Sequence, residues 1–184
     1  MKVLAVSGSL RRDSYNTSLL RAAAEAAQQG VEVVLWEGIG ELPIYDQDLE
    51  AGEVPATVRR LREEWGEADA ILFATPEYNG SVPGGLKNAI DWASRPKGEG
   101  ALANKTVAVV GASIGQFGAM WGQADLRKIL GIAGARVVSD ELPVTRAHEK
   151  FDQRGRLLDA ELHERLRGVV RTLVAEAAYE PLAA

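Results

Sequence analysis

The chain has 184 residues, of which 46% are hydrophobic and 6% aromatic, so it suits one domain with a mainly aliphatic core. Its formal net charge of -5 argues against nonspecific nucleic-acid binding, and the lack of cysteine excludes disulfides, thiolate metal sites and cysteine nucleophiles. No apolar run suits a membrane span or a signal peptide. We therefore expect a soluble, cytoplasmic protein with no nucleic-acid and no membrane partner.

Apolar runs alternate with helical patterns along the chain. In chain order we predict a strand over residues 2–7, a helix over 17–29, a strand over 31–35, a helix around 58–65, a strand over 68–75, a helix around 86–93, a strand over 106–111, a helix around 126–133, a strand over 136–138 and a helix over 162–177. The polar stretch 142–158 is expected to be a surface excursion. The tail after Tyr179 is expected to fray.

Strands that alternate with helices indicate an α/β fold in which helices cover both faces of a parallel sheet. The strands over 2–7, 68–75 and 106–111 are continuously apolar, as central parallel strands are, whereas Glu32 and Arg136 mark two edge strands. This pattern fits the flavodoxin-like strand order 2-1-3-4-5. We predict one such three-layer domain over residues 1–184, with a ligand beyond the carboxyl ends of the strands.

The loop after the first strand, residues 8–17, has the chemistry of a phosphate site. It leads into a helix N-terminus, where free N–H groups and the helix dipole favour anions. Its small hydrogen-bonding side chains are Ser9, Ser14, Asn16 and Thr17. Arg11 or Arg12 can add a charged contact. The loop has neither a Walker pattern nor G-x-G-x-x-G, and an ordinary capped turn remains the alternative interpretation.

The loops after the third and fourth strands suit a flat ring. Pro76 and Gly80 favour a tight turn that directs backbone N–H groups outward, and Tyr78 between them is suited to lining a ring. Ser113, in the small-residue loop after the fourth strand, is suited to bonding the polar side of a flavin. A plain turn with an exposed aromatic residue is the alternative for the first of these two loops.

Three segments together are typical of one family. They are residues 8–16, which begin Gly-Ser-Leu-Arg, residues 42–48, Leu-Pro-Ile-Tyr-Asp-Gln-Asp, and residues 76–92, Pro-Glu-Tyr-Asn-Gly-Ser-Val-Pro-Gly-Gly-Leu-Lys-Asn-Ala-Ile-Asp-Trp. The last segment is long and specific. On these segments the chain resembles the NADPH-dependent FMN reductase family, which includes flavin-dependent quinone, chromate and azo reductases.

The resemblance implies FMN as cofactor, NADPH or NADH as electron donor, and a small-molecule acceptor such as a quinone, an azo compound, a metal oxyanion or free flavin, reduced by alternating hydride transfer. The residues that would hold the FMN phosphate are Ser9, Arg11, Ser14, Asn16 and Thr17. The residues that would flank the isoalloxazine ring are Pro76, Glu77, Tyr78, Asn79 and Gly80, with Ser113 at its far end. No side chain is assigned a catalytic role, because the flavin carries the difficult chemistry.

The resemblance also implies a homodimer or homotetramer, in which the segment around Tyr45 and Asp46 reaches toward a flavin pocket. One position departs from the family pattern. Relatives often have Gly-Gly-x-Arg-Ala before the fourth of these helices, whereas this chain has Trp121 in place of the arginine. We expect Trp121 to pack in an interface or to cover the ring.

Two other functions remain open at this point. One is a flavodoxin-like electron carrier that binds FMN without oxidising NAD(P)H itself. The other is an α/β binding or scaffold domain that holds a different phosphate compound. We expect His148 and His163 to be surface residues and predict no metal site, and we expect Trp36, Trp65 and Trp92 to lie in the core or an interface.

Overall fold

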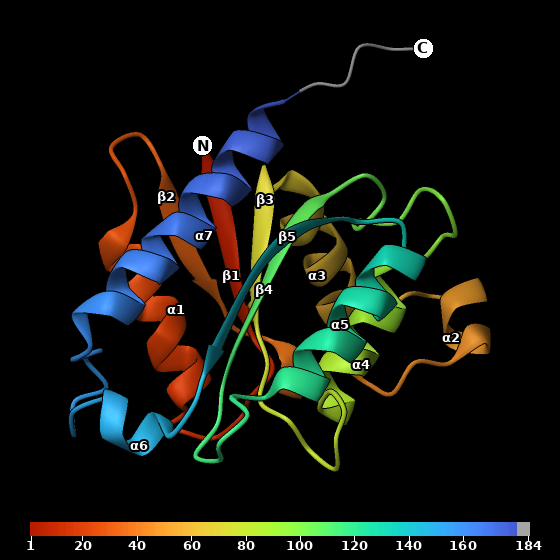
Figure 1. Cartoon of the computed structure of the whole chain (residues 1–184). Coiled ribbons are helices and arrows are strands. Elements are labelled where there is room, and N and C mark those ends of the chain that lie inside the picture. Colours follow the sequence, from red (N-terminus) through yellow and green to blue (C-terminus); the bar gives the residue numbers. More distant parts are fainter. Residues whose placement is uncertain (180–184) are drawn as a thin grey trace.

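The computed structural model describes residues 1–179 and shows a parallel sheet between two layers of helices (Figure 1). The strands are β1 (Lys2–Ser7), β2 (Glu32–Trp36), β3 (Ala70–Ala74), β4 (Thr106–Ala112) and β5 (Arg136–Val144). Their order is β2-β1-β3-β4-β5 and every neighbouring pair is parallel. The predicted fold class and strand order are confirmed, and the expectation about the tail after Tyr179 lies outside the described residues.

The helices are α1 (Tyr15–Ala26), α2 (Gln47–Ala51), α3 (Ala56–Glu67), α4 (Gly84–Ala93), α5 (Met120–Ile132), α6 (Ala147–Lys150) and α7 (Ala160–Ala178), with the short 3-10 helix η1 at Ile39–Glu41. Helices α1 and α7 cover one face of the sheet, and α3, α4 and α5 cover the other (Figure 1). Among residues 1–179, no helix combines the length and the apolarity needed to cross a bilayer.

The central strands divide their side chains between two cores. On β3, Leu72 and its neighbours at even positions face α1 and α7, whereas Ile71 and Phe73 face α3 and α4. This follows from the two-residue period of a strand and explains why β3 has no polar residue. Trp65 and Trp92 are fully buried in the second core, which confirms the predicted place of the tryptophans. Each buried ring contributes roughly 1.5–3 kcal/mol of transfer free energy.

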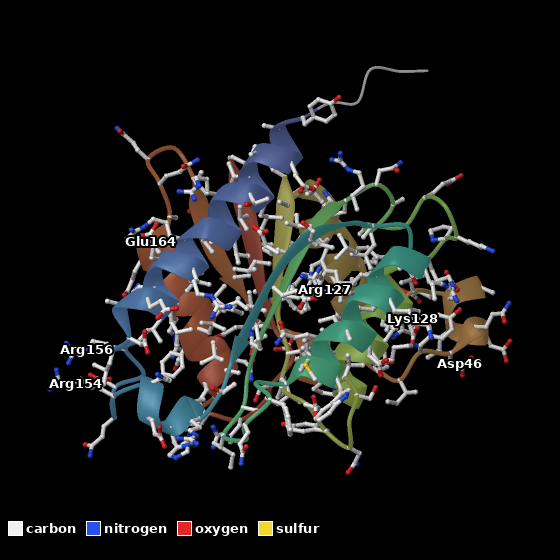
Figure 2. All side chains as sticks on the ribbon, viewed as in Figure 1. Asp46, Arg127, Lys128, Arg154, Arg156 and Glu164 are labelled. Atoms are coloured by element: carbon white, nitrogen blue, oxygen red, sulfur yellow. The ribbon has the colours of Figure 1, made fainter. Side chains whose placement is uncertain are left out.

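The fifth strand is longer than the sequence pattern predicts. It continues from Arg136 to Val144, and its register against β4 shifts between the pairs that start at Val107 and Val109. Polar residues between Val138 and Leu142 break the apolar run because this edge strand has one solvent-facing side. Figure 2 shows Arg127 on the side of α5 that faces β5, where its guanidinium donates to the carbonyl oxygens of residues 138–140.

The stretch 142–158 is not a surface excursion, which corrects that expectation. Leu142 and Val144 complete β5, and Phe151 and Leu157 are buried against the core on the α1 and α7 face. The charged residues between these four positions lower the mean hydropathy of the stretch, so composition alone hides its apolar anchors. The segment therefore completes the edge strand β5 and then packs against the core on the α1 and α7 face.

Candidate functional site

Three loops meet at the carboxyl edge of the sheet, which is the lower edge in Figure 1. They follow β1, β3 and β4. The Gly8 N–H donates to Ala74 O at 2.8 Å, and the Thr75 N–H donates to Val110 O at 3.0 Å. The first loop therefore begins bonded to the end of β3, and the second begins bonded to β4. A Cβ atom added to Gly8 would lie 2.8 Å from the Leu86 side chain and 3.4 Å from Pro76 Cδ. Gly8 thus permits the close approach of the first two loops.

The first loop presents unpaired backbone donors. Ser14 caps α1, because its Oγ accepts from the Thr17 N–H at 3.3 Å. Within the described part of the chain, the N–H groups of Arg12 and Asp13 make no hydrogen bond. The Arg11 guanidinium lies 5.3 Å from the centre of the Tyr15 ring. A cap with free amides and a neighbouring guanidinium is the donor set that a phosphate group needs.

Asn16 differs from the other predicted phosphate contacts, since its side chain is already engaged. It is 3% exposed. Its Nδ2 donates to Ala112 O at 3.0 Å, and its Oδ1 accepts from the Ala112 N–H at 2.9 Å. Asn16 therefore fastens the start of α1 to the end of β4. In this arrangement it positions the first loop against the third, and a direct phosphate contact stays a prediction.

The second loop forms a two-residue hairpin. Tyr78 and Ser81 exchange backbone hydrogen bonds of 3.0 and 3.2 Å, and the two residues between them, Asn79 and Gly80, have φ values of 54° and 75°. Positive φ at both central positions is typical of a type I′ turn, for which Asn-Gly is the preferred sequence. Tyr78 is 53% exposed at the edge, whereas Pro76 is buried beneath it. The N–H groups of Asn79 and Gly80 have no partner among residues 1–179.

Glu77 caps a helix. Its Oε2 accepts from the N–H groups of Trp121 and Gly122 at 3.0 and 3.1 Å. The residue that precedes α5, Ala119, has no side chain to bond these groups, so the second loop supplies the carboxylate. Sequence reasoning missed this contact. Its only signal is the lack of Ser, Thr, Asp or Asn at the start of α5.

The third loop combines a tight turn with exposed aromatic residues. Ser113 Oγ accepts from the Gly115 N–H at 3.2 Å, and the Ser113 N–H donates to Val144 O at 3.0 Å. Phe117 and Trp121 lie with ring centres 4.9 Å apart and are 55% and 47% exposed. Trp121 is therefore held at the edge by the tilted Phe117 ring and by the bond from its N–H to Glu77. With Phe117 it forms an apolar border along the carboxyl edge where the three loops meet, which is called the rim below.

The segment before α2 is anchored to α4, and this joins two of the three motif segments. Asn88 Oδ1 accepts from the Tyr45 N–H at 2.7 Å. Pro43 O accepts from Asn88 Nδ2 and from Trp92 Nε1, both at 2.9 Å. Ile44, between the anchored residues, is 79% exposed. Figure 2 shows Asp46 beside α2 at the periphery of the molecule, so the anchored segment projects away from the sheet.

Beside the first loop lies a cavity of about 380 Å³, which sequence reasoning missed. It opens between the first loop and the end of β2. Its lining residues are Ser7, Ser9, Leu10, Arg11, Arg12, Thr17, Arg21, Leu35, Trp36, Glu37, Gly38 and Ile39. Thr17 Oγ1 donates to Ser7 Oγ at 2.9 Å on its wall. Of the predicted site residues, Ser9, Arg11 and Thr17 line this cavity, whereas residues 76–80 and Ser113 do not.

The geometry suits a phosphorylated planar ligand. The first loop offers free N–H groups at a helix N-terminus, and the second offers free N–H groups above a buried proline. Gly111 on β4 and Gly122 on α5 have backbone atoms of the second loop within about 3 Å of an added Cβ, which shows how closely the second loop packs against these two elements. The residues present therefore fit a flavin phosphate at one end and its ring at the other.

Residues 1–149 match the family model described as NADPH-dependent FMN reductase. An NAD(P)H-dependent FMN reductase of Pseudomonas aeruginosa is 42% identical over 94% of this chain and 93% of its own length. A quinone reductase of Pseudomonas putida is 42% identical over 85% of this chain and 84% of its own. The solved structure of FerB, a flavoenzyme NAD(P)H:(acceptor) oxidoreductase from Paracoccus denitrificans, superposes with a TM-score of 0.86, at 38% identity and with 96% of each chain covered.

Proposed function

The chain belongs to the NADPH-dependent FMN reductase family, and from this premise we propose how its three loops hold the cofactor and which part of the rim receives the substrates. It is an oxidoreductase that uses FMN, with NAD(P)H as electron donor. Quinones are the acceptors that its relatives' names support. The observation that supports the loop assignment best is the presence of unpaired N–H groups on two loops of one rim.

In this proposal the first loop binds the phosphate. The backbone amides around Arg12 and the side chains of Ser9, Arg11 and Thr17 contact it directly, and Ser14 shapes the helix start as its cap. Asn16 acts through its bonds to Ala112 and keeps the first and third loops in register. Charge-assisted hydrogen bonds from a guanidinium add about 1.5–3 kcal/mol to such a contact.

The second and third loops take the ring. Pro76 and Tyr78 would contact it, and the free N–H groups of Asn79 and Gly80 would donate to its polar atoms. Glu77 holds this loop against α5, and Ser113 lies at the far end. When bound, FMN supplies the ring that accepts and returns a hydride. The protein's part is to orient that ring and to place fixed N–H dipoles where negative charge develops, so no side chain is assigned as an acid or a base.

The carboxyl edge around the second and third loops would receive the two substrates in turn. Phe117 and Trp121 border the rim with apolar surface, which suits a flat quinone. A homodimer or homotetramer, in which the anchored segment around Tyr45 and Asp46 meets a partner's site, belongs to this proposal, as does a cytoplasmic location. The exposed Ile44, on a segment whose neighbours on both sides are bonded to α4, is available for contact with a partner in such an assembly.

Anaerobic reduction tests the function. Purified protein loaded with FMN should lose its visible flavin absorbance when NADPH or NADH is added, and a quinone should then restore it. A flavodoxin-like carrier would keep its absorbance until a separate reductase is supplied. A protein that neither binds FMN nor quenches its fluorescence on titration would instead be a binding domain for another phosphate compound.

A further inference from the structure

The cavity between the first loop and β2, called here the arginine cavity, is not explained by FMN alone. Its volume of about 380 Å³ is within the range of small-molecule pockets. None of its lining residues comes from the second or third loop, so the residues proposed to hold the flavin ring do not border it. Its inner end, at Ser9, Arg11 and Thr17, coincides with the proposed phosphate contacts. The outer end remains available to a second ligand.

The charge of the outer end indicates an anion. Arg12 on the loop and Arg21 on α1 line it together with one acidic residue, Glu37. Neither arginine forms an ion pair within residues 1–179, although the chain as a whole has a net charge of -5. Arg21 lies one helical turn beyond Thr17, which places both on the same side of α1. Arginine is the residue best suited to bind a phosphate through two parallel hydrogen bonds.

The opposite wall of the cavity is apolar. Leu35, Trp36 and Ile39 line it, and Leu10 from the loop is 67% exposed above it. The Trp36 ring is fixed by two contacts. Its Nε1 donates to Glu64, and the ring packs in a T-shaped arrangement against Trp65, with the two ring centres 5.5 Å apart. A fixed apolar wall opposite two guanidinium groups is complementary to a ligand with a flat aromatic base at one end and a phosphate at the other.

We propose that the arginine cavity binds the adenosine 2′-phosphate end of NADPH, with Arg12 and Arg21 on the 2′-phosphate and the adenine along Leu35 and Trp36. This inference rests on the proposed function, since it presumes that a nicotinamide reaches the flavin ring. A dinucleotide has two ends joined by a pyrophosphate, so its adenosine end needs a site separate from the ring. The first loop borders the arginine cavity on one side and the proposed flavin site on the other. The cavity thereby distinguishes NADPH from NADH.

Kinetics with both donors test the assignment. Arg12→Gln and Arg21→Gln should each raise the KM for NADPH about tenfold more than the KM for NADH, because one lost charged contact is worth about 1.4 kcal/mol. Arg171→Gln removes the same charge from an exposed position on α7 outside the cavity and is the matched control. Equal changes in the two KM values would overturn the proposal.

A binding measurement separates this site from the FMN phosphate site. With FMN saturating, 2′,5′-ADP should bind the wild-type protein about tenfold more tightly than 5′-ADP, and Arg21→Gln should remove that difference. If Arg21→Gln instead weakens FMN binding and leaves 2′,5′-ADP binding intact, the cavity serves the flavin and the proposal is wrong. Failure of both NADPH and NADH to bleach the flavin would reject the proposed function, whereas bleaching by both without any discrimination between them would reject only this inference.

Discussion

The side chain of Asn16, at the start of α1, holds both the N–H and the carbonyl group of Ala112, at the end of β4, with bonds of 2.9 and 3.0 Å. These residues are 96 positions apart in the sequence. The contact fixes the distance between the loop proposed for the phosphate and the loop proposed for the far end of the ring. A ligand that spans both loops therefore meets a preformed gap.

Asn16→Ala should lower the free energy of unfolding by about 1–3 kcal/mol, because it leaves a buried N–H and a buried carbonyl without partners. Urea denaturation measures this loss. The affinity for FMN should also fall, because FMN spans the gap between these two loops. Gln116→Ala, at an exposed position of the third loop, is the control and should change neither quantity. Unchanged stability would show that the two bonds contribute nothing.

Arg11→Ala tests the predicted phosphate contact by comparing a flavin that has the phosphate with one that lacks it. Loss of the guanidinium should weaken FMN binding by about tenfold or more and should affect riboflavin, which lacks the phosphate, far less. Fluorescence titration with each flavin gives the two dissociation constants. Lys97→Ala removes a charge from an exposed loop elsewhere and serves as the control. Equal losses for the two flavins would remove the phosphate role of Arg11.

Glu77→Ala removes the cap of α5 and should cost about 1 kcal/mol of stability. Glu77→Gln keeps an acceptor and loses the charge, so it should fall between the wild type and the alanine variant. Thermal unfolding monitored by far-ultraviolet circular dichroism orders the three proteins. Wild-type stability in Glu77→Ala, together with a shifted flavin spectrum, would assign Glu77 to the ring instead of to the helix.

Asn88→Ala should free the segment that α4 anchors. The Tyr45 N–H loses its acceptor, and the carbonyl of Pro43 keeps only its bond from Trp92. Hydrogen exchange at Tyr45 should become faster, while exchange in β3 stays slow. Gln29→Ala, at an exposed position between α1 and β2, is the control. Unchanged exchange at Tyr45 would mean that Trp92 alone holds the segment.

Acid should weaken the start of α7. A hydrogen bond from Lys150 and two from backbone N–H groups hold the pKa of Asp159 below its usual value of 3.8. A carboxylate with a lowered folded-state pKa stabilises the fold above its unfolded pKa, and that contribution is lost as pH falls through the folded pKa. Asp159→Asn keeps a good cap but loses the charge. Its deficit in urea midpoint should thus be present at pH 7 and shrink below about pH 4; a constant deficit would contradict the linkage.

The parallel sheet and the meeting of three loops at its carboxyl edge were predictable because they follow from local patterns combined with a general rule of such folds. Continuous apolar runs identify central strands, and the carboxyl-edge rule then selects the loops. A tight turn was predicted from Pro76 and Gly80, and the structure places it at Asn79-Gly80, the pair that type I′ turns prefer. These features need no information about which distant residues touch.

The other features depend on contacts between distant parts of the chain. The bonds of Asn16 to Ala112 and of Glu77 to the start of α5 join segments tens of residues apart, and both side chains had been predicted as ligand contacts. The arginine cavity needed the end of β2 to lie beside α1, so Arg21 gave no signal of its own. The extent of β5 was missed because an edge strand has polar residues on its open side.

Helix α7 ends beside Arg136, the first residue of β5, at the edge of the sheet opposite the three loops that we propose hold the flavin. A polypeptide or a chemical linker attached there would leave the molecule on the side away from the proposed flavin site. An electrode or bead coated with the protein through that attachment would display the reactive rim outward, open to dissolved oxidants. Attachment through the hairpin of residues 78–81 would bury the same rim against the support.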